Sequence, residues 1–161
     1  MRPTYFLLFA IVLAFGYEKQ AVAQREPNTM EEAIHALEKQ LSPAQREAFK
    51  AKSEAVALTD AHFGLGMQIR NEWFRTGGSD LPRILSEAGA KSMDDMSTLV
   101  LSAYWRRLNG RPFDLQQEAG CYRQWWAEQA RLEASAKASG RTSYGSPSFN
   151  CPRCGLTPRS S

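Results

Sequence analysis

The chain has 161 residues, of which 43% are hydrophobic and 23% are charged, and its formal net charge at pH 7 is +3. This length suits one domain with a modest core. The small net charge is not the strongly basic balance of a nucleic-acid-binding protein, so we expect no nucleic-acid partner.

The N-terminus has the pattern of a cleavable export signal. Arg2 precedes an apolar run at residues 5–15 that contains no charged residue. A membrane-spanning helix needs about 20 apolar residues, and this run is shorter. The sequence AVA at residues 21–23 has the small-x-small pattern that signal peptidase recognises, so we expect residues 1–23 to be removed. The protein is therefore predicted to be periplasmic or secreted.

Neither end of the mature chain offers a membrane anchor in this interpretation. No cysteine lies near the expected cleavage site, which excludes a lipoprotein anchor there. No later stretch is apolar for long enough to span a bilayer. We therefore expect no stable membrane anchor after signal cleavage.

Two short polar helices are predicted at residues 24–54. Thr29 with Glu32, and Ser42 with Gln45, have the spacing of capping boxes at helix N-termini. Both helices carry few apolar residues. We expect this polar helical hairpin either to pack on the outside of the helices that follow or to be mobile.

The predicted helix at residues 60–74 is apolar nearly all round, which is typical of a helix surrounded by others. Gly64 and Gly66 each cost about 1 kcal/mol relative to Ala in a helix interior, a penalty that a closely packed neighbouring backbone would offset. We therefore expect a central helix, with Trp73 in the core.

Three further helices are expected. Ser79 begins a short one that Gly89 ends, Ser92 begins a strongly amphipathic one, and Asp114 begins the last. No stretch has the period of a strand. The predicted fold class is therefore all-α, a compact domain of about five to six helices at residues 55–138. After it, Ser, Gly, Pro, Thr and Arg dominate, and we expect residues 139–161 to be a flexible tail.

Three segments resemble a bacterial family described as domain of unknown function 6794. They are HFGLGMQIRNEW at residues 62–73, DDMS at residues 94–97 and YWRRLNG at residues 104–110. The resemblance covers about residues 55–133. It implies a compact helical domain and transfers no activity.

Arg70 and Asn71 lie in the most apolar predicted helix, where an unpaired charge would be costly. In the architectural interpretation, Arg70 pairs with Asp94 or Asp95, or caps the C-terminus of a helix. In the functional interpretation, Arg70, Asn71 and His62 line a pocket for an acidic or carbonyl-bearing ligand. We favour the first, because buried arginine pairs are common structural devices. A single histidine is also more often structural than catalytic.

The four tryptophans divide into two pairs. Trp73 and Trp126 fall on apolar helix stripes, which predicts core positions, whereas Trp105 and Trp125 fall off the stripes. The second pair are therefore candidates for surface contacts. Stacking on a glycan is the lesser alternative to a core role for these rings.

Cys121 and the CPRCG motif at residues 151–155 hold the three cysteines. In an oxidising compartment we expect a disulfide, either between Cys151 and Cys154 or from Cys121 to the tail. A closed zinc site needs four ligands, so this single CxxC would have to recruit Cys121 and a distant histidine. Zinc ranks second and unpaired thiols third, and we expect no metal or other cofactor.

No spacing points to a nucleophile, a base and an oxyanion-stabilising group that converge. We therefore predict no catalytic residues and an exported interaction module that binds a protein or another envelope component. Its hypothetical binding residues are His62, Arg70, Asn71, Trp105 and Trp125. The alternative is an enzyme with a site around the first three of these residues.

The export signal gives a first testable prediction. Expressed from its full sequence in a Gram-negative host, the protein should be recovered from the periplasm with Gln24 as its first residue. Intact-mass measurement of the exported protein checks this. A full-length species retained in the membrane would contradict it.

Overall fold

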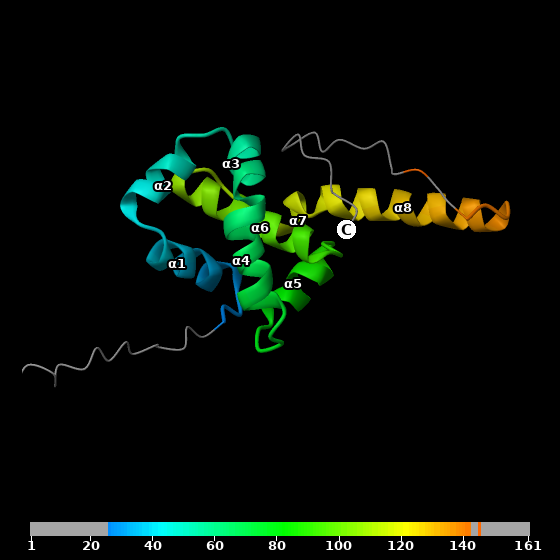
Figure 1. Cartoon of the computed structure of the whole chain (residues 1–161), viewed down its shortest axis with the longest axis horizontal. Coiled ribbons are helices and arrows are strands. Elements are labelled where there is room, and N and C mark those ends of the chain that lie inside the picture. Colours follow the sequence, from blue (N-terminus) through cyan, green and yellow to red (C-terminus); the bar gives the residue numbers. More distant parts are fainter. Residues whose placement is uncertain (1–25, 143–144, 146–161) are drawn as a thin grey trace, which may run out of the picture.

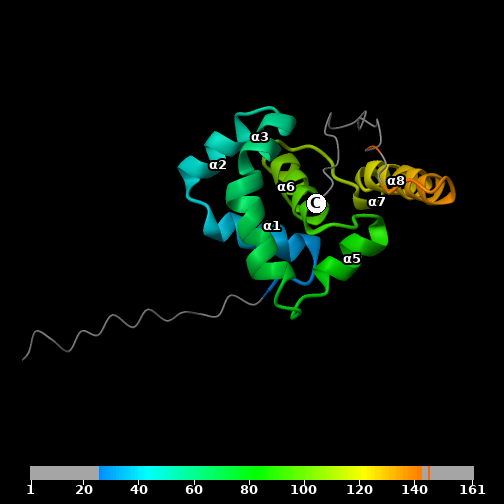
Figure 2. The same cartoon turned by 45° about the vertical axis from the view of Figure 1, so that its right-hand side comes forward.

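The computed structural model describes residues 26–142 and residue 145, and in this part of the chain it shows helices and no strand. Figures 1 and 2 show most of the helices gathered into one body, with the last long helix leading away from it. The all-α prediction is confirmed. The expected signal peptide and nearly all of the expected tail lie outside the described residues.

The first two helices are α1 (Met30–Gln40) and α2 (Pro43–Lys50), and both begin at the predicted caps. The Thr29 side chain accepts a hydrogen bond from the third residue of α1. Ser42 and Gln45 form a reciprocal capping box, with each side chain bonded to the other residue's backbone N–H. Because these bonds are local in sequence, the pattern alone located both helix starts.

The two helices differ in burial. α1 buries Ala33, Ile34 and Leu37 and packs against α6 (Met93–Leu108). α2 has no buried residue. The expectation that both helices lie outside the core is therefore wrong for α1, because three apolar residues on one face are enough to dock a short helix.

A continuous helical stretch, here called the central helix, runs from Glu54 to Phe74 in four consecutive pieces. It begins six residues before the predicted start. Two of its pieces are π-helical, which is a rare form of helix. The pieces are α3 (Glu54–Ala61), η1 (His62–Gly66), α4 (Met67–Ile69) and η2 (Arg70–Phe74).

The central helix is buried on one side only. Ile69, Trp73 and Phe74 belong to the core, as the sequence predicts for Trp73. Phe63 is 71% exposed and Met67 is 48% exposed. The expectation of a helix surrounded by neighbours is thus wrong for this second face, because the described helices pack mainly on the side that faces α6.

The two glycines of the central helix have different surroundings. A Cβ atom at Gly66 would lie 3.2 Å from the Ala61 carbonyl oxygen and 3.2 Å from Arg70 Nη1, so the packing there is close. A Cβ atom at Gly64 would meet nothing within 4 Å. Close approach of a neighbour therefore accounts for Gly66 but not for Gly64.

The next two helices, α5 (Leu81–Ala88) and α6, follow the predicted signals. The Ser79 hydroxyl accepts a hydrogen bond from the first residue of α5 at 3.1 Å. Gly89 ends α5 with a φ of 128°, a conformation that favours glycine. Ser92 and Asp95 form a capping box at the start of α6.

The last predicted helix is divided into two pieces, α7 (Leu115–Glu118) and α8 (Gly120–Ala138). Asp114 caps α7 as predicted, by accepting a hydrogen bond from the backbone of Gln117 at 2.9 Å. α8 is the long helix that projects from the body in Figure 1.

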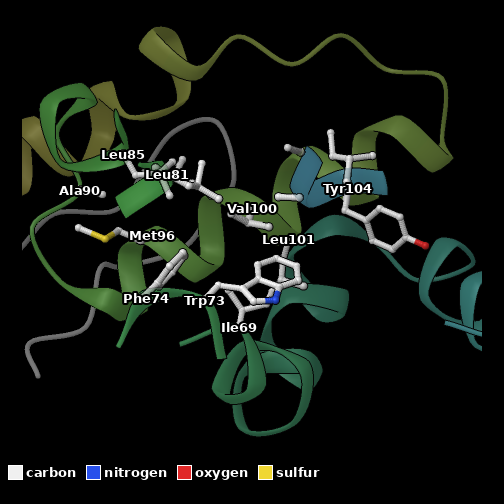
Figure 3. Close-up of a cluster of buried hydrophobic side chains, with 14 of the residues drawn as sticks. Ile69, Trp73, Phe74, Leu81, Leu85, Ala90, Met96, Val100, Leu101 and Tyr104 are labelled. Atoms are coloured by element: carbon white, nitrogen blue, oxygen red, sulfur yellow. The ribbon is translucent and has the colours of Figure 1, made fainter. Parts of the chain in front are cut away.

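The core is organised around α6, which packs against α1, α2, α5 and the central helix. Figure 3 shows Ile69 and Trp73 of the central helix beside Val100 and Leu101 of α6. Because α6 is enclosed by several helices, it buries residues all round and not only along the predicted stripe.

Trp73→Ala should reduce the free energy of unfolding by about 3 to 5 kcal/mol, because it removes a buried ring and leaves a cavity. Urea melts of the two proteins measure this. Phe63→Ala is the matched control, and its exposed ring should cost less than about 1 kcal/mol. Equal losses in both variants would contradict the assignment of these two faces.

Candidate functional site

A buried network of charged groups joins three segments of the chain at Arg106 of α6. Arg106 Nε donates to Glu54 Oε1 at 3.0 Å, and its Nη1 and Nη2 donate to the two carboxylate oxygens of Glu118 at 2.7 and 3.1 Å. The Ser102 hydroxyl donates to Glu54 Oε1 at 2.5 Å. Arg106 and Glu118 are buried.

This network holds the fold together and is not an open site. Removing one partner of a buried ion pair costs about 3 to 5 kcal/mol, because the other charge stays buried without a partner. Glu54 is the first residue of the central helix, and Glu118 is the last residue of α7. Arg106 therefore fixes the start of the central helix and the end of α7 against α6. This network was not predicted from the sequence. The feature that indicated it is the presence of Arg106 in the helix with the clearest apolar stripe.

Arg70 has a partner at each nitrogen of its guanidinium group. Nε pairs with Asp94 at 3.0 Å, Nη1 donates to the Ser97 hydroxyl at 3.1 Å, and Nη2 donates to the His62 carbonyl oxygen at 3.2 Å. The predicted pairing of Arg70 with Asp94 or Asp95 is confirmed, with Asp94 as the partner. These contacts tie the central helix to the first turns of α6.

The other two members of the predicted pocket do not complete a site around Arg70. Asn71 is exposed, next to Arg70 in sequence. His62 is half-buried, and its ring meets the ring of Phe63 edge to face with 4.7 Å between the centroids. The contacts of Arg70 support a structural role, in which it holds the central helix against α6. They do not support a ligand pocket formed with Asn71 and His62.

Trp105 and Trp125 are not surface residues, so the prediction that they are exposed is wrong. Trp105 is 4% exposed, and its indole N–H donates to the Lys52 carbonyl oxygen at 3.1 Å. Trp125 is 1% exposed and meets Trp126 edge to face at 4.6 Å. A residue off the apolar stripe is buried when a second element covers that face, which sequence periodicity does not reveal.

Asp95 is a buried carboxylate whose Oδ2 atom accepts three hydrogen bonds. The donors are Trp126 Nε1 at 2.7 Å and the backbone N–H groups of Lys91 and Ser92, each at 3.2 Å. Burial raises the pKa of Asp95 above its ordinary value, against the opposing effect of these hydrogen bonds. The hydrogen bond from Trp126 to Asp95 links α8 to the start of α6.

The described residues hold no group of three or more His, Cys, Asp or Glu side chains that could bind a metal ion. Cys121 is buried at the start of α8, whereas Cys151 and Cys154 lie outside the described residues. In the same part of the chain, no helix is both long and apolar enough to cross a membrane.

An exposed apolar face on the central helix is the surface feature that sequence reasoning missed. Val56 is 49% exposed, Phe63 is 71% exposed and Met67 is 48% exposed. Phe63 and Met67 are four residues apart, about one helical turn, and Val56 lies seven residues before Phe63 in the same continuous helix. We call these three residues the apolar face.

Comparison with known proteins gives one family. Residues 26–108 match a family model described as Domain of unknown function (DUF6794). The match includes α1 and α2 and ends with α6, whereas the resemblance seen in the sequence begins near residue 55 and extends to about residue 133. No curated protein and no solved structure matches the chain.

Asp95→Asn should leave the protein at least as stable as the wild type at pH 7, because a single oxygen at the Oδ2 position can still accept all three hydrogen bonds. Asp95→Ala leaves three donors without this acceptor and should be clearly destabilising, since each donor that stays buried and unpaired costs about 1 to 3 kcal/mol. Urea melts compare the three proteins. An Asn variant as unstable as the Ala variant would show that the negative charge itself is required.

The pH dependence of the same variants tests the raised pKa. A raised pKa means that the folded protein binds the proton more tightly than the unfolded chain does. The wild type should therefore be most stable relative to Asp95→Asn below the ordinary pKa of 3.8, and this relative stability should fall as pH rises through the folded-state pKa. Melts between about pH 3.5 and 7 measure the difference.

Proposed function

Because the chain belongs to the DUF6794 family, which brings no activity with it, we propose a function from the molecule's own surface. The protein is an exported module that binds a partner protein in the cell envelope. The observation that carries this proposal is the apolar face of Val56, Phe63 and Met67.

Single exposed apolar residues are common on soluble proteins, but an aligned set on one helix is a feature of binding surfaces. Burying a phenylalanine side chain is worth about 1.5 to 3 kcal/mol, and Phe63 is the most exposed of the three. The spacing of the apolar face is also the spacing with which a helix enters a hydrophobic groove. A partner with a complementary apolar groove or helix would gain this energy.

Two features beside Phe63 support a contact made by another molecule. Gly64 is exposed, and a Cβ atom there would meet nothing within 4 Å, so the described fold gives no reason for the cost of a glycine. A partner's backbone could approach closely at this point. The same residues form the π-helical piece η1, and such pieces occur frequently at functional sites.

The enzyme alternative receives less support from the contacts. The guanidinium nitrogens of Arg70 are already bonded within the protein, and Trp105 and Trp125 are too buried to stack on a ligand. Export of the protein through the signal at residues 1–23, and a disulfide among its cysteines, are part of the proposal and follow from the sequence.

Photo-crosslinking tests the binding surface directly. A photoreactive phenylalanine analogue at position 63 should form a crosslink to one partner protein in the cell envelope, which mass spectrometry then identifies. The same analogue at position 134, an exposed position on α8, is the matched control and should give no such product. Equal crosslinking at both positions, or none at position 63, would contradict the proposal.

Substitutions in the apolar face measure how much its residues contribute to the affinity for the partner. The double variant Phe63→Ser and Met67→Ser should bind the identified partner about tenfold or more weakly, since burial of the phenylalanine alone is worth at least about 1.5 kcal/mol. The control replaces the exposed pair Ala130 and Ala134 by serine, and its affinity should be unchanged. Thermal melts should show that both variants stay folded.

A further inference from the structure

We propose that Asn109 is a site of spontaneous deamidation, in which its side-chain amide is converted to a carboxylate, and that the folded end of α6 controls the rate. Asn109 is the one asparagine in the chain that precedes a glycine; the residues that follow the others are Thr29, Glu72 and Cys151. Glycine has no Cβ atom, so its backbone nitrogen is the least hindered. This inference does not depend on the proposed function.

The reaction joins two groups that are adjacent in the chain. The backbone nitrogen of Gly110 loses its proton and attacks Cγ of Asn109, which forms a C–N bond and closes a cyclic imide. The bond from Cγ to Nδ2 breaks, and Nδ2 takes up a proton and leaves as ammonia. Water then opens the ring at one of its carbonyl groups, which gives aspartate or isoaspartate. The net change consumes a water molecule, releases ammonia and involves no oxidation or reduction.

The folded end of α6 holds both reacting groups in other contacts. Nδ2 of Asn109 donates to the Trp105 carbonyl oxygen at 2.9 Å, one turn back along the helix. The backbone N–H of Asn109 donates to the same oxygen at 3.1 Å. The N–H of Gly110 donates to the Arg107 carbonyl oxygen at 3.3 Å. Attack on Cγ therefore requires the Asn109 side chain to leave Trp105 and the Gly110 nitrogen to leave Arg107.

The turn that follows Asn109 adds a second restraint. Gly110 has a φ of 62°, a left-handed conformation that favours glycine. The backbone N–H of Arg111 donates to the Arg106 carbonyl oxygen at 2.9 Å, which together with the bond from Gly110 completes a Schellman motif. Helix ends open locally at a lower free energy than the whole protein unfolds. The last turn of α6 therefore sets how often the reactive arrangement forms.

Deamidation makes such an opening permanent. A carboxylate at position 109 has no N–H to donate, so the bond to the Trp105 carbonyl oxygen is lost. The carboxylate also places a negative charge at the C-terminus of α6, where the helix dipole disfavours it. Isoaspartate adds a carbon atom to the main chain and shifts the Schellman bonds out of register. The same turn carries Arg106, which pairs with Glu54 at the start of the central helix, so its loss weakens that attachment.

Peptide mapping of aged protein tests the site. The purified protein is incubated at mildly alkaline pH, one sample folded and one in concentrated guanidinium chloride, and is then reduced, alkylated and digested with trypsin. Residue 109 falls in the peptide of residues 108–123, because trypsin does not cleave between Arg111 and Pro112. In the denaturant this peptide should convert to its aspartate and isoaspartate forms. In the folded protein the conversion should be at least about tenfold slower, since the end of α6 has to open first.

Asn71 is the matched control in the same digest. It is exposed on the central helix but precedes Glu72, and trypsin places it in the peptide of residues 71–75. It should stay unmodified in both samples over the time in which Asn109 reacts. An unmodified Asn109 in the denaturant, or an equally fast reaction at Asn71, would overturn the assignment of the site. Equal rates at Asn109 with and without denaturant would overturn control by the fold.

The variant Asn109→Asp tests the structural consequence, because it reproduces one of the two products. Its melting temperature should be lower than that of the wild type, since the bond to Trp105 is lost. Asn71→Asp makes the same exchange in the last turn of the central helix, so it carries a similar charge–dipole cost and should lower the melting temperature less. Equal melting temperatures for Asn109→Asp and the wild type would show that deamidation does not weaken the end of α6.

Discussion

The buried guanidinium group of Arg106 constrains how the helices around α6 are arranged. Its partners, Glu54 and Glu118, come from the start of the central helix and the end of α7. A charge at this depth is tolerated only when its hydrogen-bonding groups are satisfied, so both segments have to dock in one register. Arg70 acts similarly at the other end of α6, through Asp94 and Ser97. The central helix is thereby held to α6 near both of its ends.

This attachment explains why the central helix has two unlike faces. The ion pairs and the core residues Ile69 and Trp73 fix one side against α6, and the opposite side, with Val56, Phe63 and Met67, stays exposed. The apolar residues that made the helix resemble a fully enclosed one thus divide between stabilising the fold and forming a surface. The proposed function uses the second group, so its variants can be tested without disturbing the first.

The tryptophans show how periodicity misleads when a helix has more than one neighbour. Trp105 lies off the main stripe of α6, but the chain before the central helix covers it and accepts its indole N–H through Lys52. Trp125 is buried on a side of α8 that the main core does not contact. For Trp105, a contact with a segment distant in sequence accompanies the burial, and helical periodicity alone does not reveal such a contact.

The sequence by itself determined the local features: the all-α class, the caps at Thr29, Ser42, Ser92 and Asp114, and the family. These depend on interactions between residues three or four apart, or on motifs read in order. Only the tertiary structure decided that α1 joins the core, that Arg106 pairs with Glu54 and Glu118, and that Phe63 is exposed. Such contacts join residues far apart in the chain, and one helical pattern is compatible with several ways of packing them.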